Sequence, residues 1–218
     1  MNKAVIFDMD GVIVDSEPVY MNTYHHPFIK HNQDVSLGDI HQVIGLSNEA
    51  TWNILGNLWS PKKTEAEIQT FYENILNDTL VEDYLDIKMP HLEFLMRNLK
   101  DKGIKMAIAS GSPLNTIKKV VKDLNLDPYI SLYISGDQVA KSKPAPDVYL
   151  EAMRVLDVKP ENTIIVEDSH IGIRAGKGAG VNVIAYKDHR FGLNQSAADY
   201  IVHDHIETFH TIMKHFNL

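Results

Sequence analysis

The sequence predicts an α/β protein in which a doubly wound parallel sheet is interrupted by an all-helical segment. Residues 5–7 are Val, Ile and Phe, an apolar run typical of a parallel strand covered on both faces. From about residue 87 onward, apolar runs alternate with helical patterns, which favours parallel pairing through right-handed crossovers. Residues 16–86 show helical patterns only. We therefore expect a core domain of residues 1–15 and 87–218, with a helical cap domain inserted at residues 16–86.

Local signals support each expected element. The insertion contains helix-start patterns at Ser36 with Asp39, Thr64 with Glu67, and Ser47 with Glu49. After it, the expected helices are 90–102, 113–125, 145–156, 171–179 and 206–216. The expected strands are 104–109, 132–135, 163–166, 181–185 and 200–202. Gly103 and Gly180 are expected to end the helices that precede them.

Composition excludes several classes of partner. The chain of 218 residues has a formal charge of -8, which argues against nucleic acid or an anionic membrane as a partner. It contains no cysteine, so it has neither disulfides nor thiolate metal sites. No stretch approaches the ~18 apolar residues of a membrane helix. We expect a soluble cytoplasmic protein and, since nothing indicates an obligate dimer, a monomer.

The strongest functional signal is the pair of carboxylates that follows the first strand. Asp8 and Asp10 are two residues apart, so on extended backbone they point the same way, and Gly11 then allows a sharp turn. Like charges this close need a proton or a cation between them. The carboxyl end of a strand in an α/β sheet is where such a site is expected. These residues therefore indicate a metal-dependent active site.

A calcium loop or a plain turn is the alternative, since Asp and Gly are common in turns. Counted from Asp8, an EF-hand loop needs an oxygen ligand, a Gly and a Glu where this chain has Val12, Ile13 and Val19. The calcium-loop alternative is therefore disfavoured.

A second segment suggests an anion site. Ser110 and Gly111 come directly before a helix that begins near Pro113, and the free amides and dipole of a helix N-terminus favour a phosphate. An ordinary helix cap at Ser112 remains the alternative.

Two more segments supply charge. Pro144 favours an extended conformation at Lys143, which then can point at an anion, although a solvated lysine is the commoner case. Glu167 and Asp168 follow an apolar strand, and alternation predicts that at most one lies directly beside Asp8 and Asp10. Carboxylates, one basic group and an anion-binding turn together suit Mg²⁺ and a phosphate ester.

Asp8-Met9-Asp10-Gly11, Ser110, Lys143-Pro144 and Glu167-Asp168 resemble, in order and spacing, the four motifs of the haloacid dehalogenase-like phosphohydrolase superfamily. The branch that contains β-phosphoglucomutase and sugar-phosphate phosphatases is the most similar. The resemblance implies a Rossmann-like core and a Mg²⁺ cofactor. It further implies that Asp8 is the nucleophile and Asp10 the general acid and base. Ser110, Gly111 and Lys143 would bind the phosphoryl group. Asp8, Asp168 and the carbonyl of Asp10 would bind Mg²⁺, with Glu167 supporting it through water.

The cap argues for hydrolysis of a sugar or polyol phosphate rather than a mutase reaction. The mutase grips a second phosphate with a basic cap residue, but residues 16–86 contain no Arg, and Asn48 follows Gly45-Leu46-Ser47 where that Arg is expected. Glu17 and Asn48 are candidate substrate contacts. A non-catalytic phosphate sensor is a further alternative.

Four histidines near the end of the chain also invite a metal interpretation: His203, His205, His210 and His215. Their irregular spacing favours a solvated tail instead.

Overall fold

The computed structural model describes residues 2–44, 46, 48–76 and 83–218, apart from the side chains of residues 48, 73, 74 and 76. The chain forms two compact units: Met1–Asp15 with Asp83–Leu218, and Ser16–Glu82. Residues 83–86, expected with the insertion, group with the first unit. There the short 3₁₀ helix η2 (Tyr84–Ile87) follows Asp83, whose side chain accepts a hydrogen bond from the amide of Leu85.

The first unit confirms the predicted α/β fold. Its strands are β1 (Ala4–Phe7), β2 (Lys105–Ser110), β3 (Leu132–Ser135), β4 (Thr163–Glu167), β5 (Asn182–Tyr186) and β6 (Tyr200–Val202). Its helices are α5 (Leu92–Asp101), α6 (Leu114–Asp123), α7 (Asp147–Leu156), α8 (His170–Gly178) and α9 (His205–Phe216), with 3₁₀ turns η3 (Gly136–Gln138) and η4 (Pro160–Asn162). The expected elements are present, with ends that differ by at most two residues.

The strands form a six-stranded sheet in the order β3-β2-β1-β4-β5-β6, and every pair is parallel. The central strand β1 pairs with β2 and with β4, so that Phe7 lies beside Ile108 and Val166. The strand order reverses direction around β1. In an open α/β sheet, a ligand site is expected at the carboxyl ends of the strands at such a point.

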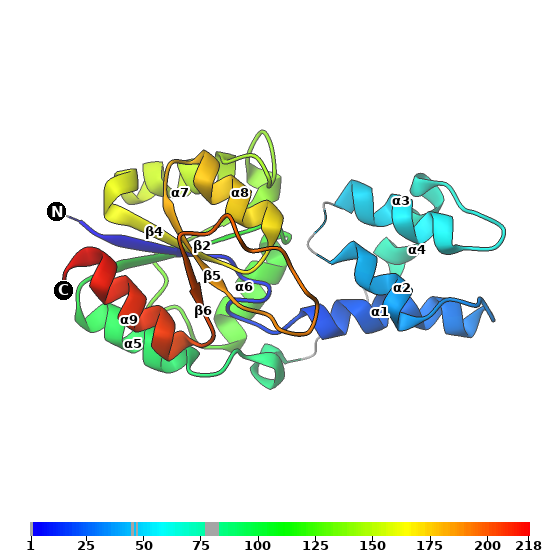
Figure 1. The fold of residues 1–218 in the computed structure, drawn as a ribbon, viewed down its shortest axis with the longest axis horizontal. Helices are drawn as coiled ribbons and strands as arrows, with labels where there is room; N and C mark the ends of the chain where they lie inside the picture. The colour runs from blue at the N-terminus through cyan, green and yellow to red at the C-terminus, as the bar shows by residue number, and fades with distance from the viewer. Residues whose placement is uncertain (1, 45, 47, 77–82) are drawn as a thin grey trace. The chain divides into compact units, whose positions relative to one another are not determined.

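Helices cover both faces of this sheet. Figure 1 shows α7 and α8 on one face and α5 and α9 on the other. Ala4 and Ile6 of β1 belong to the buried cluster that contains Tyr149 of α7 and Ile173 of α8. Val5 and Phe7 are also fully buried, so both faces of β1 are covered. This explains why the strand is apolar throughout rather than alternating.

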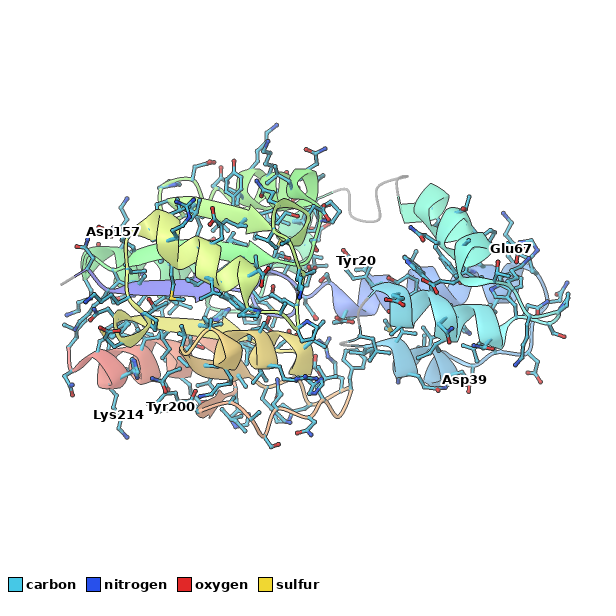
Figure 2. All side chains as sticks on the ribbon, turned by 90° about the horizontal axis from the view of Figure 1, so that it is seen from above. Tyr20, Asp39, Glu67, Asp157, Tyr200 and Lys214 are labelled. Atoms are coloured by element: carbon cyan, nitrogen blue, oxygen red, sulfur yellow. The ribbon has the colours of Figure 1, made fainter. Side chains whose placement is uncertain are left out.

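The second unit contains only helices among its described residues: α1 (Glu17–Lys30), α2 (Leu37–Ile40), the 3₁₀ turn η1 (His41–Val43), α3 (Asn48–Leu58) and α4 (Glu65–Leu76). Two predicted capping boxes are confirmed. The hydroxyls of Ser36 and Thr64 accept from the amides of Asp39 and Glu67, whose carboxylates accept in return. Figure 2 labels both of these carboxylates on the helical unit. The predicted helix start at Ser47 lies outside the described residues.

A cluster of aromatic rings forms the interior of this unit. The Trp52 and Tyr72 rings stack with centroids 6.0 Å apart, and Tyr24 meets both edge-on. The hydroxyl of Tyr72 donates to the carbonyl of Tyr24 at 2.6 Å, so its polar end is satisfied. No described helix in either unit is long and apolar enough to cross a membrane.

Candidate active site

The turn after β1 brings the first acidic pair to the carboxyl end of the sheet. The amide of Asp8 continues the strand pairing by donating to Val166 at 2.9 Å. Gly11 then adopts a φ of 72°, in the left-handed region that favours glycine. A Cβ at this position would lie 2.1 Å from Oδ2 of Asp168. Gly11 therefore permits both the turn and the close approach of the Asp168 carboxylate.

A buried lysine joins two of the predicted acidic residues. Nζ of Lys143 donates to Oδ1 of Asp8 and to Oε1 of Glu167, at 2.7 Å each, although 135 and 24 residues separate the partners. All three side chains are almost fully buried. The structure therefore brings Lys143 to the acidic cluster rather than to solvent.

Tyr149 of α7 completes this cluster, and sequence reasoning did not identify it. Its hydroxyl donates to Oε1 of Glu167 at 2.9 Å, and its ring centroid lies 4.9 Å from Nζ of Lys143. The hydroxyl therefore holds the Glu167 carboxylate, and the ring face lies against the ammonium group of Lys143. The sequence signal for Tyr149 was its place as a polar aromatic residue near the start of the helix that follows Lys143-Pro144. This signal is weak, because an aromatic residue buried in a helix is equally explained by core packing.

Glu167 is fully engaged by protein donors. Besides Lys143 and Tyr149 at Oε1, its Oε2 accepts from the amides of Asp168 and Ser169 and from the Ser169 hydroxyl. Gly172 is required beside it, because a Cβ there would lie 1.6 Å from Oε1. Glu167 therefore acts on this site chiefly by fixing Lys143 and the loop of Asp168.

The electrostatics of the cluster follow from burial and charge. Burial raises the pKa of Asp8 to about 7, since desolvation outweighs the attraction of Lys143 and since Glu167 and Asp10 add repulsion. Desolvation also acts on Glu167, but Lys143 and the hydrogen bonds outweigh it and lower its pKa. The pKa of Lys143 is raised because the two carboxylates overcome desolvation. Lys143 is therefore cationic, and an added cation would favour the charged form of Asp8.

The acidic residues fit a divalent cation. One carboxylate oxygen from each of Asp8, Glu167 and Asp168 lies within 4.8 Å of the others. The expectation that at most one of Glu167 and Asp168 lies directly beside Asp8 and Asp10 was wrong for Asp8, because the chain leaves the strand at Glu167 and alternation ends there. Since Glu167 already accepts five hydrogen bonds, Asp8 and Asp168 are the better direct ligands. Hard carboxylate oxygens suit Mg²⁺.

The loop after β2 contributes hydroxyls. The Ser110 hydroxyl is buried and accepts from the amide of Ser112 at 3.0 Å, and the Ser112 hydroxyl donates to Oδ2 of Asp10 at 2.6 Å. Ser112 therefore does not cap α6, whose N-cap residue is Pro113 and has no side-chain capping bond. A Cβ at Gly111 would meet nothing within 4 Å. This geometry favours the anion-site interpretation over the ordinary cap.

The remaining predicted residues lie elsewhere. Glu17 is in the first turn of α1, in the helical unit. Asn48 begins α3, but its side chain lies outside the described residues. The prediction of a solvated histidine tail was wrong for His205, which is fully buried as the first residue of α9.

Comparison with known proteins agrees with the fold and identifies the family. The family model described as haloacid dehalogenase-like hydrolase matches residues 5–186. A phosphorylated carbohydrates phosphatase of Thermotoga maritima is 29% identical over 187 residues, which cover 84% of this chain and 83% of that protein. The beta-phosphoglucomutase of Bacillus subtilis is 31% identical over 191 residues, with coverages of 82% and 80%.

A solved structure gives the same result. The crystal structure of a putative beta-phosphoglucomutase from Thermotoga maritima is 25% identical and has a TM-score of 0.74. The match covers 97% of this chain and 99% of the chain in that structure. The match of the family model across most of the chain is decisive: the protein belongs to the haloacid dehalogenase-like hydrolase family.

Proposed function

We propose that this protein is a Mg²⁺-dependent phosphoric monoester hydrolase that cleaves a small sugar or polyol phosphate through an aspartyl-phosphate on Asp8. The observation that carries the proposal is the bridge from Lys143 to Asp8 and Glu167, beside Asp168, together with the hydrogen bond from Ser112, just before α6, to Asp10. A buried cation next to an acidic metal site supplies the charges that a phosphoryl group needs.

The chain's own residues account for each proton. A carboxylate oxygen of Asp8 attacks phosphorus, the ester P–O bond breaks, and Asp10 protonates the departing alkoxide oxygen. Asp10 then takes a proton from water, whose oxygen attacks the phosphorus of the aspartyl-phosphate. The acyl-phosphate bond breaks to release inorganic phosphate and the Asp8 carboxylate. The Ser112 hydroxyl, 2.6 Å from Oδ2 of Asp10, orients this acid and base.

Lys143 and the Ser110-Gly111 segment hold the phosphoryl oxygens in this proposal. Lys143 does so as a point charge, and the amides at the start of α6 add donors. Asp8, Asp168 and the backbone carbonyl of Asp10 would hold Mg²⁺. When bound, the ion neutralises carboxylate charge and stabilises negative charge on the phosphoryl oxygens.

The helical unit is proposed to act as a cap that supplies substrate contacts, with Glu17 and Asn48 as candidates. A mutase reaction, as named for the Bacillus subtilis relative, is the second candidate. The insertion has no Arg, and its lysines are Lys30, Lys62 and Lys63. Of these, Nζ of Lys63 lies 5.3 Å from the centroid of Trp59. The scarcity of basic residues in the insertion favours hydrolysis over a mutase reaction, which needs a second phosphate to be bound.

The test is phosphate release from a panel of hexose, pentose and polyol phosphates, with Mg²⁺ or a chelator, by wild type and Asp8→Asn. We expect Mg²⁺-dependent release from some members and none from Asp8→Asn. Conversion of β-glucose 1-phosphate to glucose 6-phosphate without release would identify a mutase. Binding of a phosphate analogue without turnover of any member would identify a sensor.

A further inference from the structure

The family model ends at residue 186, yet the segment after it contacts both acidic loops. Two buried polar side chains of residues 187–218, Gln195 and His205, donate hydrogen bonds to backbone carbonyls near the proposed metal ligands. Neither belongs to the motifs that suggested the function.

Gln195 supports the loop of Asp168. It is 2% exposed, and its Nε2 donates to the carbonyl of Asp168 at 2.5 Å and to the carbonyl of Tyr186 at 2.7 Å. Both donor hydrogens of the amide are therefore used. Its Oε1 has no hydrogen-bond partner among the described residues. The Gln195 side chain thus ties the backbone of Asp168 to Tyr186, the last residue of β5.

His205 supports the turn after Asp10. Its Nε2 lies 2.8 Å from the carbonyl of Val12, 193 residues away, and a carbonyl only accepts, so Nε2 carries the hydrogen. The turn itself closes by hydrogen bonds from the amides of Ile13 and Val14 to the carbonyl of Met9. Burial lowers the pKa of His205 to about 4, so the ring is neutral at pH 7.

The Asp168 loop held by Gln195 and the turn held by His205 contact each other. The ring of His205 packs on Tyr186, the residue whose carbonyl Gln195 also holds, with centroids 4.9 Å apart. The Asp168 carboxylate lies directly against Gly11 of the supported turn. The distance between the proposed ligands on the two loops therefore depends on both side chains.

We propose that Gln195 and His205 are positioning residues that set the Mg²⁺ affinity of this site by fixing the backbone of its two acidic loops. Mg²⁺ tolerates little departure from octahedral geometry at short distances, so its binding is sensitive to ligand placement. Residues that orient metal ligands typically affect affinity by 10- to 100-fold. The inference rests on the proposed function, because it assumes that Asp8, Asp10 and Asp168 hold the ion.

The test is calorimetric titration of each protein with Mg²⁺, without substrate. Gln195→Met keeps the length of the side chain and removes both donors. His205→Gln places an amide nitrogen near the position of Nε2, whereas His205→Asn is one methylene too short. Asn194→Ala, in the same loop, and His215→Met, on the same helix, are matched controls, because their side chains hydrogen-bond to Ser196 and Tyr200. Thermal unfolding without metal verifies that each variant is folded.

We expect Gln195→Met and His205→Asn each to raise the Mg²⁺ dissociation constant by about 10-fold or more. His205→Gln and both controls should stay close to wild type, and saturating Mg²⁺ should recover most of the phosphatase activity of Gln195→Met. A folded Gln195→Met or His205→Asn that binds Mg²⁺ as tightly as wild type would overturn the inference and leave only a structural role. Failure of wild type to bind Mg²⁺ at all would instead remove the proposed function, and the inference with it.

Discussion

The hydroxyl of Ser112 donates a hydrogen bond of 2.6 Å to Oδ2 of Asp10, across 102 residues of sequence. The hydroxyl of Ser135 in turn donates to the carbonyl of Ser112 at 2.7 Å, which holds the loop after β2 in place. Asp10 is therefore oriented by the loop after β2, and β3 holds that loop in place.

Replacing Ser112 with Ala should slow the reaction more than it weakens substrate binding. The Asp10 carboxylate would lose the donor that orients it, so we expect kcat to fall about 10-fold with KM within about twofold. Steady-state kinetics on the preferred phosphate ester measures both constants. Ser112→Thr keeps the hydroxyl and serves as the control. An unchanged kcat in Ser112→Ala would show that this bond does not orient the acid.

Replacing Lys143 with Met should destabilise the fold in a pH-dependent way. The change leaves Asp8 and Glu167 buried without their counter-charge, so the free energy of unfolding at pH 7 should fall by about 3–5 kcal/mol. The loss should be smaller at pH 5, where Asp8 takes up a proton and the repulsion is relieved. Urea denaturation at the two pH values measures this.

The matched control for Lys143 is Lys177→Met, which breaks a salt bridge of 2.6 Å to Asp199 that is partly exposed. Its cost should be about 1 kcal/mol or less at either pH. Equal losses for the two lysines would contradict the structure.

Gly11→Ala should weaken Mg²⁺ binding in addition to straining the backbone. The new Cβ would collide with the carboxylate of Asp168 and also force an unfavourable φ. Gly103→Ala isolates the second effect, since Gly103 has a φ of 69° and open space around it. We expect both variants to lose about 1 kcal/mol of stability from φ alone. Only Gly11→Ala should lose Mg²⁺ affinity in calorimetry, and equal affinities would argue against Asp168 as a ligand.

The buried His205 should make stability fall in acid. Its pKa is about 4 in the folded protein against an ordinary 6.5, so the unfolded chain binds more protons between these values. The contribution of neutral His205 to the free energy of unfolding is fully present above pH 6.5 and is lost as the pH falls toward 4. At pH 5 the lost contribution is about 2 kcal/mol. The difference in unfolding free energy between wild type and His205→Gln should therefore shift in favour of the variant between pH 7 and pH 5. A difference that does not change with pH would mean that folding does not lower the pKa of His205.

Much of the architecture was readable from local patterns. Apolar runs, glycine stops and capping boxes depend on neighbouring residues, so the strand at 132–135 and the boxes at Ser36 and Thr64 were found where the structure has them. The positions of Asp8, Ser110 and Glu167 at strand ends also followed, because parallel strands end on one edge of a sheet.

Which groups these side chains contact was decided by the tertiary structure alone. Sequence alternation could not show that Glu167 would accept hydrogen bonds from Lys143 and Tyr149. It also could not show that the Ser112 hydroxyl would donate to Asp10 instead of capping α6. Nor could spacing show that His205 would be buried against Val12. A periodic pattern reports which face of an element is buried, whereas a hydrogen bond between residues more than 100 positions apart depends on how separate elements pack. The sequence by itself therefore determined the parallel sheet and the candidate catalytic residues, and packing determined which of them hold the others in place.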